Sequence, residues 1–252
     1  MSYVGAIILL LLVARPAAAN FAAAEAAEQR GDVAAAYQAC TADAQAGDAR
    51  CQNYLGVLSE LGRGTAQDAA EAVRLFRLAA LQGFAAAQYN LGRHYAAGLG
   101  VRKEEAEAAR WYGMAAEQGS PAAQNALAIL DATGRGVPRD REAALELFRR
   151  AAASGYALAQ LNLALAFDHG RLMPHDPLRA YIWYSIAARP GSDQTLREQA
   201  AEGRDRVAKK IPLPEIEAAR IAARSWTREA RIPTKEWRHR GARPADREAA
   251  SS

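Results

Sequence analysis

The stretch of sequence that decides the fold spans residues 85–120 and reads AAAQYNLGRHYAAGLGVRKEEAEAARWYGMAAEQGS. Its landmark residues return at a spacing of 36 through the middle of the chain. The recurring sets are Leu55, Leu91, Leu127 and Leu163; Gly62, Gly98, Gly134 and Gly170; and Gly83, Gly119, Gly155 and Gly191. A fixed period of this length predicts a stacked helical solenoid.

Each repeat is predicted to form two helices, and four repeats are complete: 49–84, 85–120, 121–156 and 157–192. The first helix ends at a glycine-rich loop, because glycine accepts the positive φ that terminates a helix. The second helix begins at an acidic residue that can cap free backbone N–H groups. These caps are Asp68, Glu104, Asp140 and Asp176. We therefore expect an all-α fold, a right-handed α-solenoid of helix-turn-helix repeats.

The regions beside the four repeats differ from them in predictable ways. Residues 20–48 keep part of the register and are predicted to form a degenerate N-terminal repeat, in which Ala39–Cys40 replaces an aromatic pair. Residues 193–230 are predicted to form capping helices, since a solenoid must cover its open end. Residues 231–252 are polar, and we expect a disordered tail there.

The segment 1–19 has the pattern of a signal peptide. An apolar run covers residues 4–14, and the small residues Ala17, Ala18 and Ala19 predict cleavage before Asn20. We expect an exported protein, periplasmic or secreted, with no stable membrane insertion after cleavage. A retained membrane anchor is the alternative.

Charge is distributed unevenly along the chain. Residues 20–191 hold 17 Lys and Arg against 18 Asp and Glu, whereas residues 192–252 hold 14 against 10. The basic excess therefore lies in the C-terminal part. No basic stretch is interleaved with aromatic residues, so nucleic-acid binding is not expected.

The two cysteines, Cys40 and Cys51, are predicted to form a disulfide, as an even pair in an exported protein does. Cys40 occupies the register position of Phe76, and Cys51, 11 residues later, that of Ala87. We infer that these positions face each other between one repeat's second helix and the next repeat's first helix. Two free buried thiols are the alternative.

Unit 85–120 resembles the Sel1-like repeat, a relative of the tetratricopeptide repeat. The motif residues are Ala87, Gln88, Leu91, Gly92, Tyr95, Gly98, Gly100, Val101, Ala108, Trp111, Tyr112, Ala115, Ala116, Gln118 and Gly119. Asp131 departs from the pattern at the Tyr95 position, either as a packing compromise or as a polar ligand contact. The resemblance implies a scaffold or adaptor that binds a protein or peptide in the bacterial envelope.

Two other functions stay open from the same resemblance. Cysteine-rich members of the family have a proposed β-lactamase-like activity, so a hydrolase acting on cell-wall or β-lactam substrates is one alternative. A secreted effector that interacts with a host is the other. We expect no enzyme, no catalytic residues and no cofactor, because the sequence contains no nucleophile elbow, phosphate loop or zinc-protease helix.

Several histidines and acidic residues are candidates for a chemical site. His169 and His175 flank one loop with Asp168 and Asp176, but a metal needs three or four converging ligands, so we expect no metal. Arg30–Gly31–Asp32 spells a cell-adhesion tripeptide that we interpret as coincidental.

The first helices are predicted to line a concave groove, as in tetratricopeptide-like solenoids. The candidate binding residues are Tyr54, Leu58, Tyr89, Arg93, His94, Ile129, Leu130 and Leu165. Apolar and aromatic side chains at these positions suit an extended peptide or a partner helix. The alternative is that some of them pack against the neighbouring first helix.

Overall fold

A computed structural model describes residues 17–226, with side-chain burial from Phe21 onward. The described residues form helices and loops, with no strand among them. The helices are α1 (Ala17–Gln29), α2 (Val33–Gln45), α3 (Ala49–Leu61), α4 (Ala69–Leu81), α5 (Ala85–Ala97), α6 (Glu105–Glu117), α7 (Pro121–Thr133), α8 (Arg141–Ala153), α9 (Ala157–His169), α10 (Pro177–Ala187), α11 (Gln194–Ala208) and α12 (Leu213–Ser225). The fold is the all-α solenoid expected from the sequence period.

The chain divides into two compact units. Among the described residues, one comprises the chain up to Ala87 with Leu99–Arg102, and the other comprises Gln88–Gly98 with the chain from Lys103 onward. The predicted tail at 231–252 and most of the predicted signal segment lie outside the described residues. Within the described part, no helix is both long and apolar enough to cross a bilayer.

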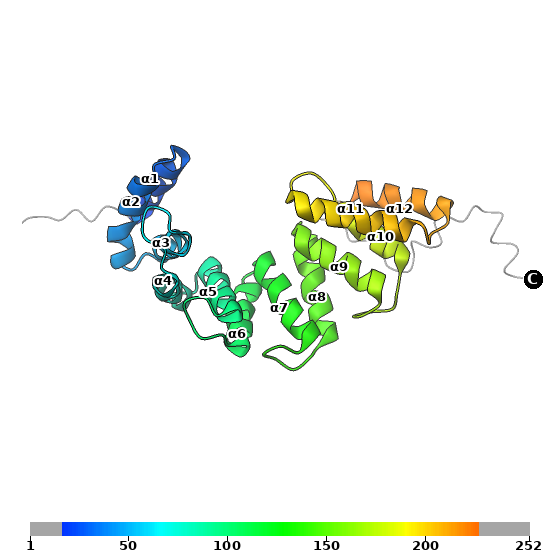
Figure 1. Cartoon of the computed structure of the whole chain (residues 1–252), viewed down its shortest axis with the longest axis horizontal. Helices are drawn as coiled ribbons and strands as arrows, with labels where there is room; N and C mark the ends of the chain where they lie inside the picture. The colour runs from blue at the N-terminus through cyan, green and yellow to red at the C-terminus, as the bar shows by residue number, and fades with distance from the viewer. Residues whose placement is uncertain (1–16, 227–252) are drawn as a thin grey trace, which may run out of the picture. The chain divides into compact units, whose positions relative to one another are not determined.

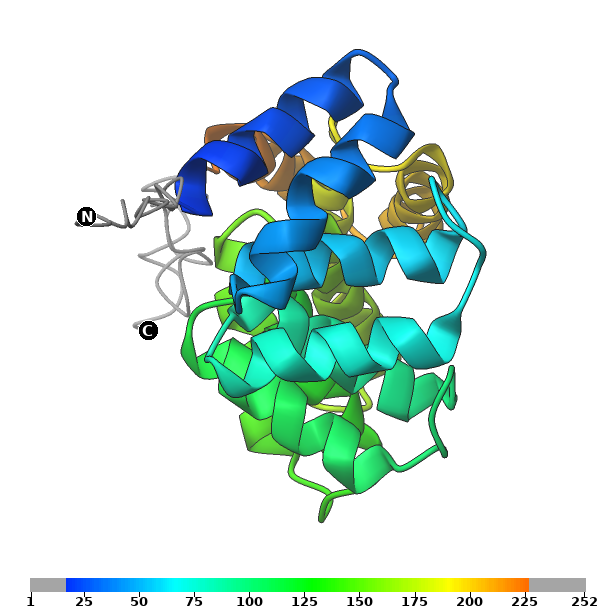
Figure 2. The same cartoon turned by 90° about the vertical axis from the view of Figure 1, so that its left-hand side faces the viewer.

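The first unit stacks two helical hairpins, α1–α2 and α3–α4, drawn in blue and cyan in Figure 2. α2 packs against α3, and the shared core consists mainly of alanines with Cys40, Cys51, Leu55 and Leu58. The predicted degenerate repeat is thus a helical hairpin whose buried residues are small.

The second unit continues the same arrangement through α12. α7 packs on α8, α9 on α10, and successive hairpins join through the α6–α7 and α8–α9 contacts. Glycine in the first helix allows an aromatic ring to approach closely, because a Cβ at Gly92 would lie 2.7 Å from a ring carbon of Tyr112. The Leu–Gly element of the repeat therefore serves packing.

The second helices begin as the sequence predicts, with one exception. Asp68, Asp140 and Asp176 each accept a hydrogen bond from a backbone N–H of the first turn. Glu104 occupies the same position but makes no side-chain cap hydrogen bond. Glutamate is one methylene longer than the aspartate that N-caps favour, so its expected capping role is wrong.

Within each unit, a buried glutamine joins a hairpin to the one before it. Gln124 Nε2 donates to the carbonyl of Ala116 at 3.2 Å, and Gln160 Nε2 donates to that of Ala152 at 3.2 Å. Gln52 makes the equivalent bond to Ala44 at 3.0 Å. Each of these carbonyls also accepts the backbone N–H of the glycine that follows its helix, so the glutamine supplies a second donor from the next repeat.

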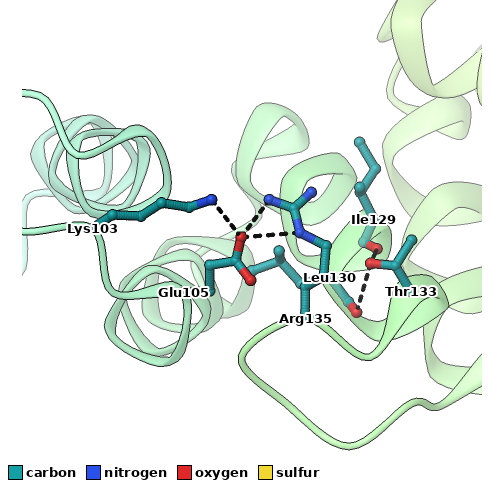
Figure 3. A network of polar contacts seen from close by, with 6 residues as sticks. All are labelled: Lys103, Glu105, Ile129, Leu130, Thr133 and Arg135. Carbon is teal, nitrogen blue, oxygen red and sulfur yellow. Dashed lines mark hydrogen bonds and ion pairs between the residues drawn. The ribbon is translucent and has the colours of Figure 1, made fainter.

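The loop after α7 rests on the start of α6. Gly136 has a φ of +73°, and a Cβ there would lie 2.3 Å from the carbonyl carbon of Glu105. Figure 3 shows the polar contacts around this loop, in which the Glu105 carboxylate accepts from Arg135 at 2.6 Å and pairs with Lys103 at 3.1 Å. The second glycine of the loop is thus required by a backbone contact between repeats.

α11 and α12 cover the last repeat by packing against α10 (Figure 1). A Cβ at Gly203 of α11 would lie 2.5 Å from the Tyr184 ring, as Gly92 approaches Tyr112. Trp226 meets Trp183 edge-on with ring centroids 6.2 Å apart. α11 and α12 lie within the segment 193–230 that is predicted to form capping helices.

Candidate partner-binding surface

The cysteine pair is joined as expected. The sulfurs of Cys40 and Cys51 form a disulfide between α2 and α3, with α-carbons 5.1 Å apart. Both residues are fully buried. The register argument, which placed these two positions opposite each other, therefore holds for the contact between α2 and α3. The equivalent Phe148 and Ala159 belong to one core cluster.

Three of the predicted groove residues lie in the core instead. Leu58, His94 and Leu130 are exposed by 1%, 0% and 3%, respectively. They share one register position, because each is 36 residues from the next. That position faces inward, so placing these three residues on a partner-binding surface is wrong.

Tyr54 is half-buried because α1 lies beside it. Its hydroxyl donates to Glu28 at 3.1 Å, and its ring meets Phe21 with centroids 6.1 Å apart. Burial, and then the Glu28 carboxylate, raise the pKa of Tyr54 to about 12. For this residue the alternative interpretation applies, in which the side chain packs against the neighbouring first helix.

The remaining predicted residues are half-buried on α5, α7 and α9 of the second unit. Arg93, Ile129 and Leu165 share a register position, so they recur as one row along successive first helices. Ile129 and Leu165 pack partly against the core and stay partly exposed. Tyr89 lies one turn earlier on α5, with its ring 5.8 Å from that of Tyr112.

Two residues that the sequence analysis missed adjoin this row. Asn162 Nδ2 of α9 donates to the buried Asn125 Oδ1 of α7 at 2.8 Å, which links the two helices. Tyr156 begins α9 without capping it, and burial, followed by the neighbouring Tyr89, raises its pKa. An aromatic residue at a cap position, where Ser120 caps α7, was the available signal for Tyr156. We call Tyr89, Arg93, Ile129, Tyr156, Asn162 and Leu165 the first-helix surface.

Charged side chains are rare on the helices that carry this surface. α5, α7 and α9 hold one Asp, Glu, Lys or Arg each, whereas α6 holds four and α8 holds five. Of the three, Asp168 is buried against Arg206, and Asp131 lies near Asp140. Arg93 is the charged residue among those that form the surface.

The histidines considered for a metal do not converge with other ligands. His175 Nδ1 lies 2.6 Å from the backbone carbonyl of Asp168. Within residues 17–226, no three His, Cys, Asp or Glu side chains are grouped so that they could hold a metal ion. Arg30 and Asp32 are exposed beside Gly31, and Asp32 caps α2 through Ala35.

Stacked helical hairpins, joined within each unit by a glutamine, define a helical repeat protein of the solenoid class. The Sel1 repeat family matches residues 49–84, 85–120, 121–156 and 157–192, which together exceed half of the chain. The protein therefore belongs to the Sel1 repeat family. Its four matched repeats have the bounds that the 36-residue period predicts.

Solved structures of similar proteins agree. A Sel1 repeat protein from Oxalobacter formigenes is 25% identical, with a TM-score of 0.65 over 87% of this chain and 94% of that one. The protective antigen c5321 of uropathogenic Escherichia coli is 25% identical, with a TM-score of 0.64 over 92% of this chain. The match spans 54% of the c5321 chain, about half its length. No curated protein matches the sequence.

Proposed function

We propose that this protein is an exported scaffold or adaptor that binds a protein or peptide through the first-helix surface. Sel1 repeat proteins are generally protein-interaction scaffolds, and typically not enzymes. The observation that carries the proposal is the contrast in charge between α5, α7 and α9, with one charged residue each, and α6 and α8, with four and five; the largely buried α10 also has one. Protein interfaces are depleted of charge at their centre and enriched in aromatic residues and arginine.

The composition of the surface favours an uncharged segment of a partner. Tyr89 and Tyr156 offer rings with polar ends, which serve interfaces because one end is apolar and the other can form hydrogen bonds. Ile129 and Leu165 offer aliphatic contact, and Asn162 adds an amide. An extended peptide or an amphipathic helix could use these groups in successive repeats.

Two features support export: the apolar segment near the N-terminus and the disulfide. The apolar run at 4–14 has the length of a signal-peptide core, and the Cys40–Cys51 bond suits an oxidising compartment. Cell fractionation followed by N-terminal sequencing tests this part of the proposal. We expect mature protein beginning at Asn20 in the periplasmic or secreted fraction; full-length protein in the cytoplasm would contradict it.

Binding is tested by affinity capture from the native envelope with matched variants. A Tyr89→Ala, Arg93→Ala variant should capture about tenfold less partner than wild type, or even less. A few central side chains carry most of the binding energy of an interface. The control is Arg149→Ala with Arg150→Ala, which changes two exposed side chains of the charged helix α8. Equal capture by both variants would contradict the assignment of the surface.

The hydrolase alternative stays a prediction. A chromogenic β-lactam assay on purified protein addresses it directly, and turnover above that of buffer would replace the scaffold proposal with an enzymatic one.

A further inference from the structure

The last helix of the described residues exposes two large aliphatic side chains. On α12, Leu213 is 77% exposed and Ile221 is 67% exposed. Residues eight positions apart lie on one side of a helix, so these two side chains share a face. Glu217 lies midway between them on that face, where it is paired with Arg220. An exposed pair of this kind is unexpected on a helix that covers the open end of a solenoid.

The opposite face of α12 is fixed in place. Ile216, Ala219 and Ala223 are buried in the core shared with α10. Arg220 Nε donates to the Tyr181 hydroxyl at 3.2 Å, and Arg189 donates to backbone carbonyls of Ala223 and Trp226 at the end of the helix. These contacts hold the helix in one rotation, with Leu213 and Ile221 pointing away from the protein.

Cations surround the apolar pair. Lys209 and Lys210 are exposed in the turn that precedes Leu213, and Arg220 and Arg224 are exposed further along α12. Against these four cations stand Glu215 and Glu217, and Glu217 is paired with Arg220 at 2.6 Å. The turn and helix together therefore carry a net positive charge beside two exposed aliphatic side chains.

We propose that α12 and the turn before it dock on an anionic lipid surface. A membrane interface accepts aliphatic side chains into the boundary of its acyl region while its acidic headgroups attract Lys and Arg. Leu213 and Ile221 insert, and Lys209, Lys210 and Arg224 contact headgroup phosphates. The first-helix surface lies on α5, α7 and α9, whereas this docking face lies on α12 and the turn before it. The inference is therefore independent of the proposed protein partner.

The test is co-sedimentation of the full chain, as it is secreted or purified, with lipid vesicles. Wild-type protein should bind vesicles of phosphatidylglycerol mixed with phosphatidylcholine, and not vesicles of phosphatidylcholine alone. Binding should weaken as salt is added, because salt screens headgroup attraction. Leu213→Ser with Ile221→Ser should reduce binding about tenfold or more, since it removes the inserted side chains.

Two further variants keep the test specific. Lys209→Gln with Lys210→Gln should weaken binding to the acidic vesicles by about tenfold. Leu81→Ser removes a comparably exposed leucine, 68% exposed on α4, and should bind as wild type does. Circular dichroism confirms that each variant is folded.

The outcomes separate the occupants of this face. No binding of wild type to acidic vesicles overturns the proposal, as does binding that the Leu213→Ser, Ile221→Ser variant retains in full. If wild type instead forms a dimer in solution that this variant abolishes, the face is an interface between two copies and the lipid proposal fails.

Discussion

The carboxylate of Asp168 accepts a 2.6 Å contact from the guanidinium of Arg206, and this pair ties the last repeat to its cap. Asp168 is on α9 and its side chain is 4% exposed, whereas Arg206 on α11 is 53% exposed. The Tyr184 hydroxyl donates to the same carboxylate oxygen at 3.1 Å. The cap is therefore held by a polar anchor as well as by apolar packing.

Arg206→Ala should destabilise the cap by about 1–3 kcal/mol, because it leaves a buried carboxylate with one fewer partner. Burial opposes ionisation of Asp168, but hydrogen bonds from Arg206 and Tyr184 outweigh it and hold its pKa below the ordinary value. A carboxyl group whose pKa is lower in the folded state stabilises the fold at pH values above its unfolded-state pKa of about 3.9. This contribution is lost as the pH falls through the lower, folded-state pKa. Urea unfolding at several pH values should show the difference between variant and wild type shrinking in acid; a difference independent of pH would contradict the anchor.

Reduction of the Cys40–Cys51 bond should destabilise the N-terminal hairpin by about 3 kcal/mol on the chain-entropy model. Mass spectrometry of non-reduced peptides should first show the two cysteines linked. Cys40→Phe with Cys51→Ala supplies the control, since it restores the residue pair of the later repeats. Its stability should be indifferent to reductant, and a reductant effect of the same size in this variant would rule out the disulfide as the cause.

Asp131→Asn should stabilise the second unit near neutral pH by less than about 1 kcal/mol, because water still screens a half-exposed group. Burial, and then the neighbouring Asp140, raise the pKa of Asp131. A raised pKa means that the charged form costs stability once the pH exceeds the unfolded value, and that this cost disappears in acid. Thermal unfolding at neutral pH checks the expected stabilisation, and thermal unfolding at acidic pH checks its disappearance. An equal increase in stability at the two pH values would show that the charge of Asp131 is not responsible.

Gly136→Ala should cost about 3 kcal/mol or more, because the new Cβ meets backbone at Glu105 in addition to the strain of a positive φ. Gly119→Ala is the matched control, with a φ of +85° and no heavy atom within 4 Å of the added Cβ. It should cost about 1–2 kcal/mol from backbone strain alone. Similar unfolding free energies for the two variants would argue against the close contact between loop and helix.

The 36-residue period was sufficient to predict the helices, the loops between them and the cysteine pairing. Each of these depends on residue types that recur at fixed positions, and a recurring residue type at one position has the same physical role in each repeat. The period also placed the Cys40–Cys51 bond, because the substituted positions could be compared with Phe76 and Ala87 in a complete repeat.

The surface could be predicted only in part. Leu58, His94 and Leu130 share a register position next to that of Arg93, Ile129 and Leu165 along the helix. Moving by one residue along a helix rotates the side-chain direction by about 100°. That rotation is enough to separate a buried side chain from a half-exposed one. Sequence periodicity in alanine-rich helices does not distinguish such neighbours well, because small residues occur on both faces. Tyr156 and Asn162 were missed since neither belongs to the repeat motif.

The glutamine contacts that join hairpins have a consequence for how this protein can change in length. Gln124 and Gln160 bind their preceding hairpins in the same way, so a 36-residue unit duplicated after Ser120 would find compatible neighbours on both sides. A unit added after α10 would not, because Gly203 and Arg206 of α11 already occupy that end. Evolution can therefore extend the array from within while its C-terminal boundary stays closed to growth.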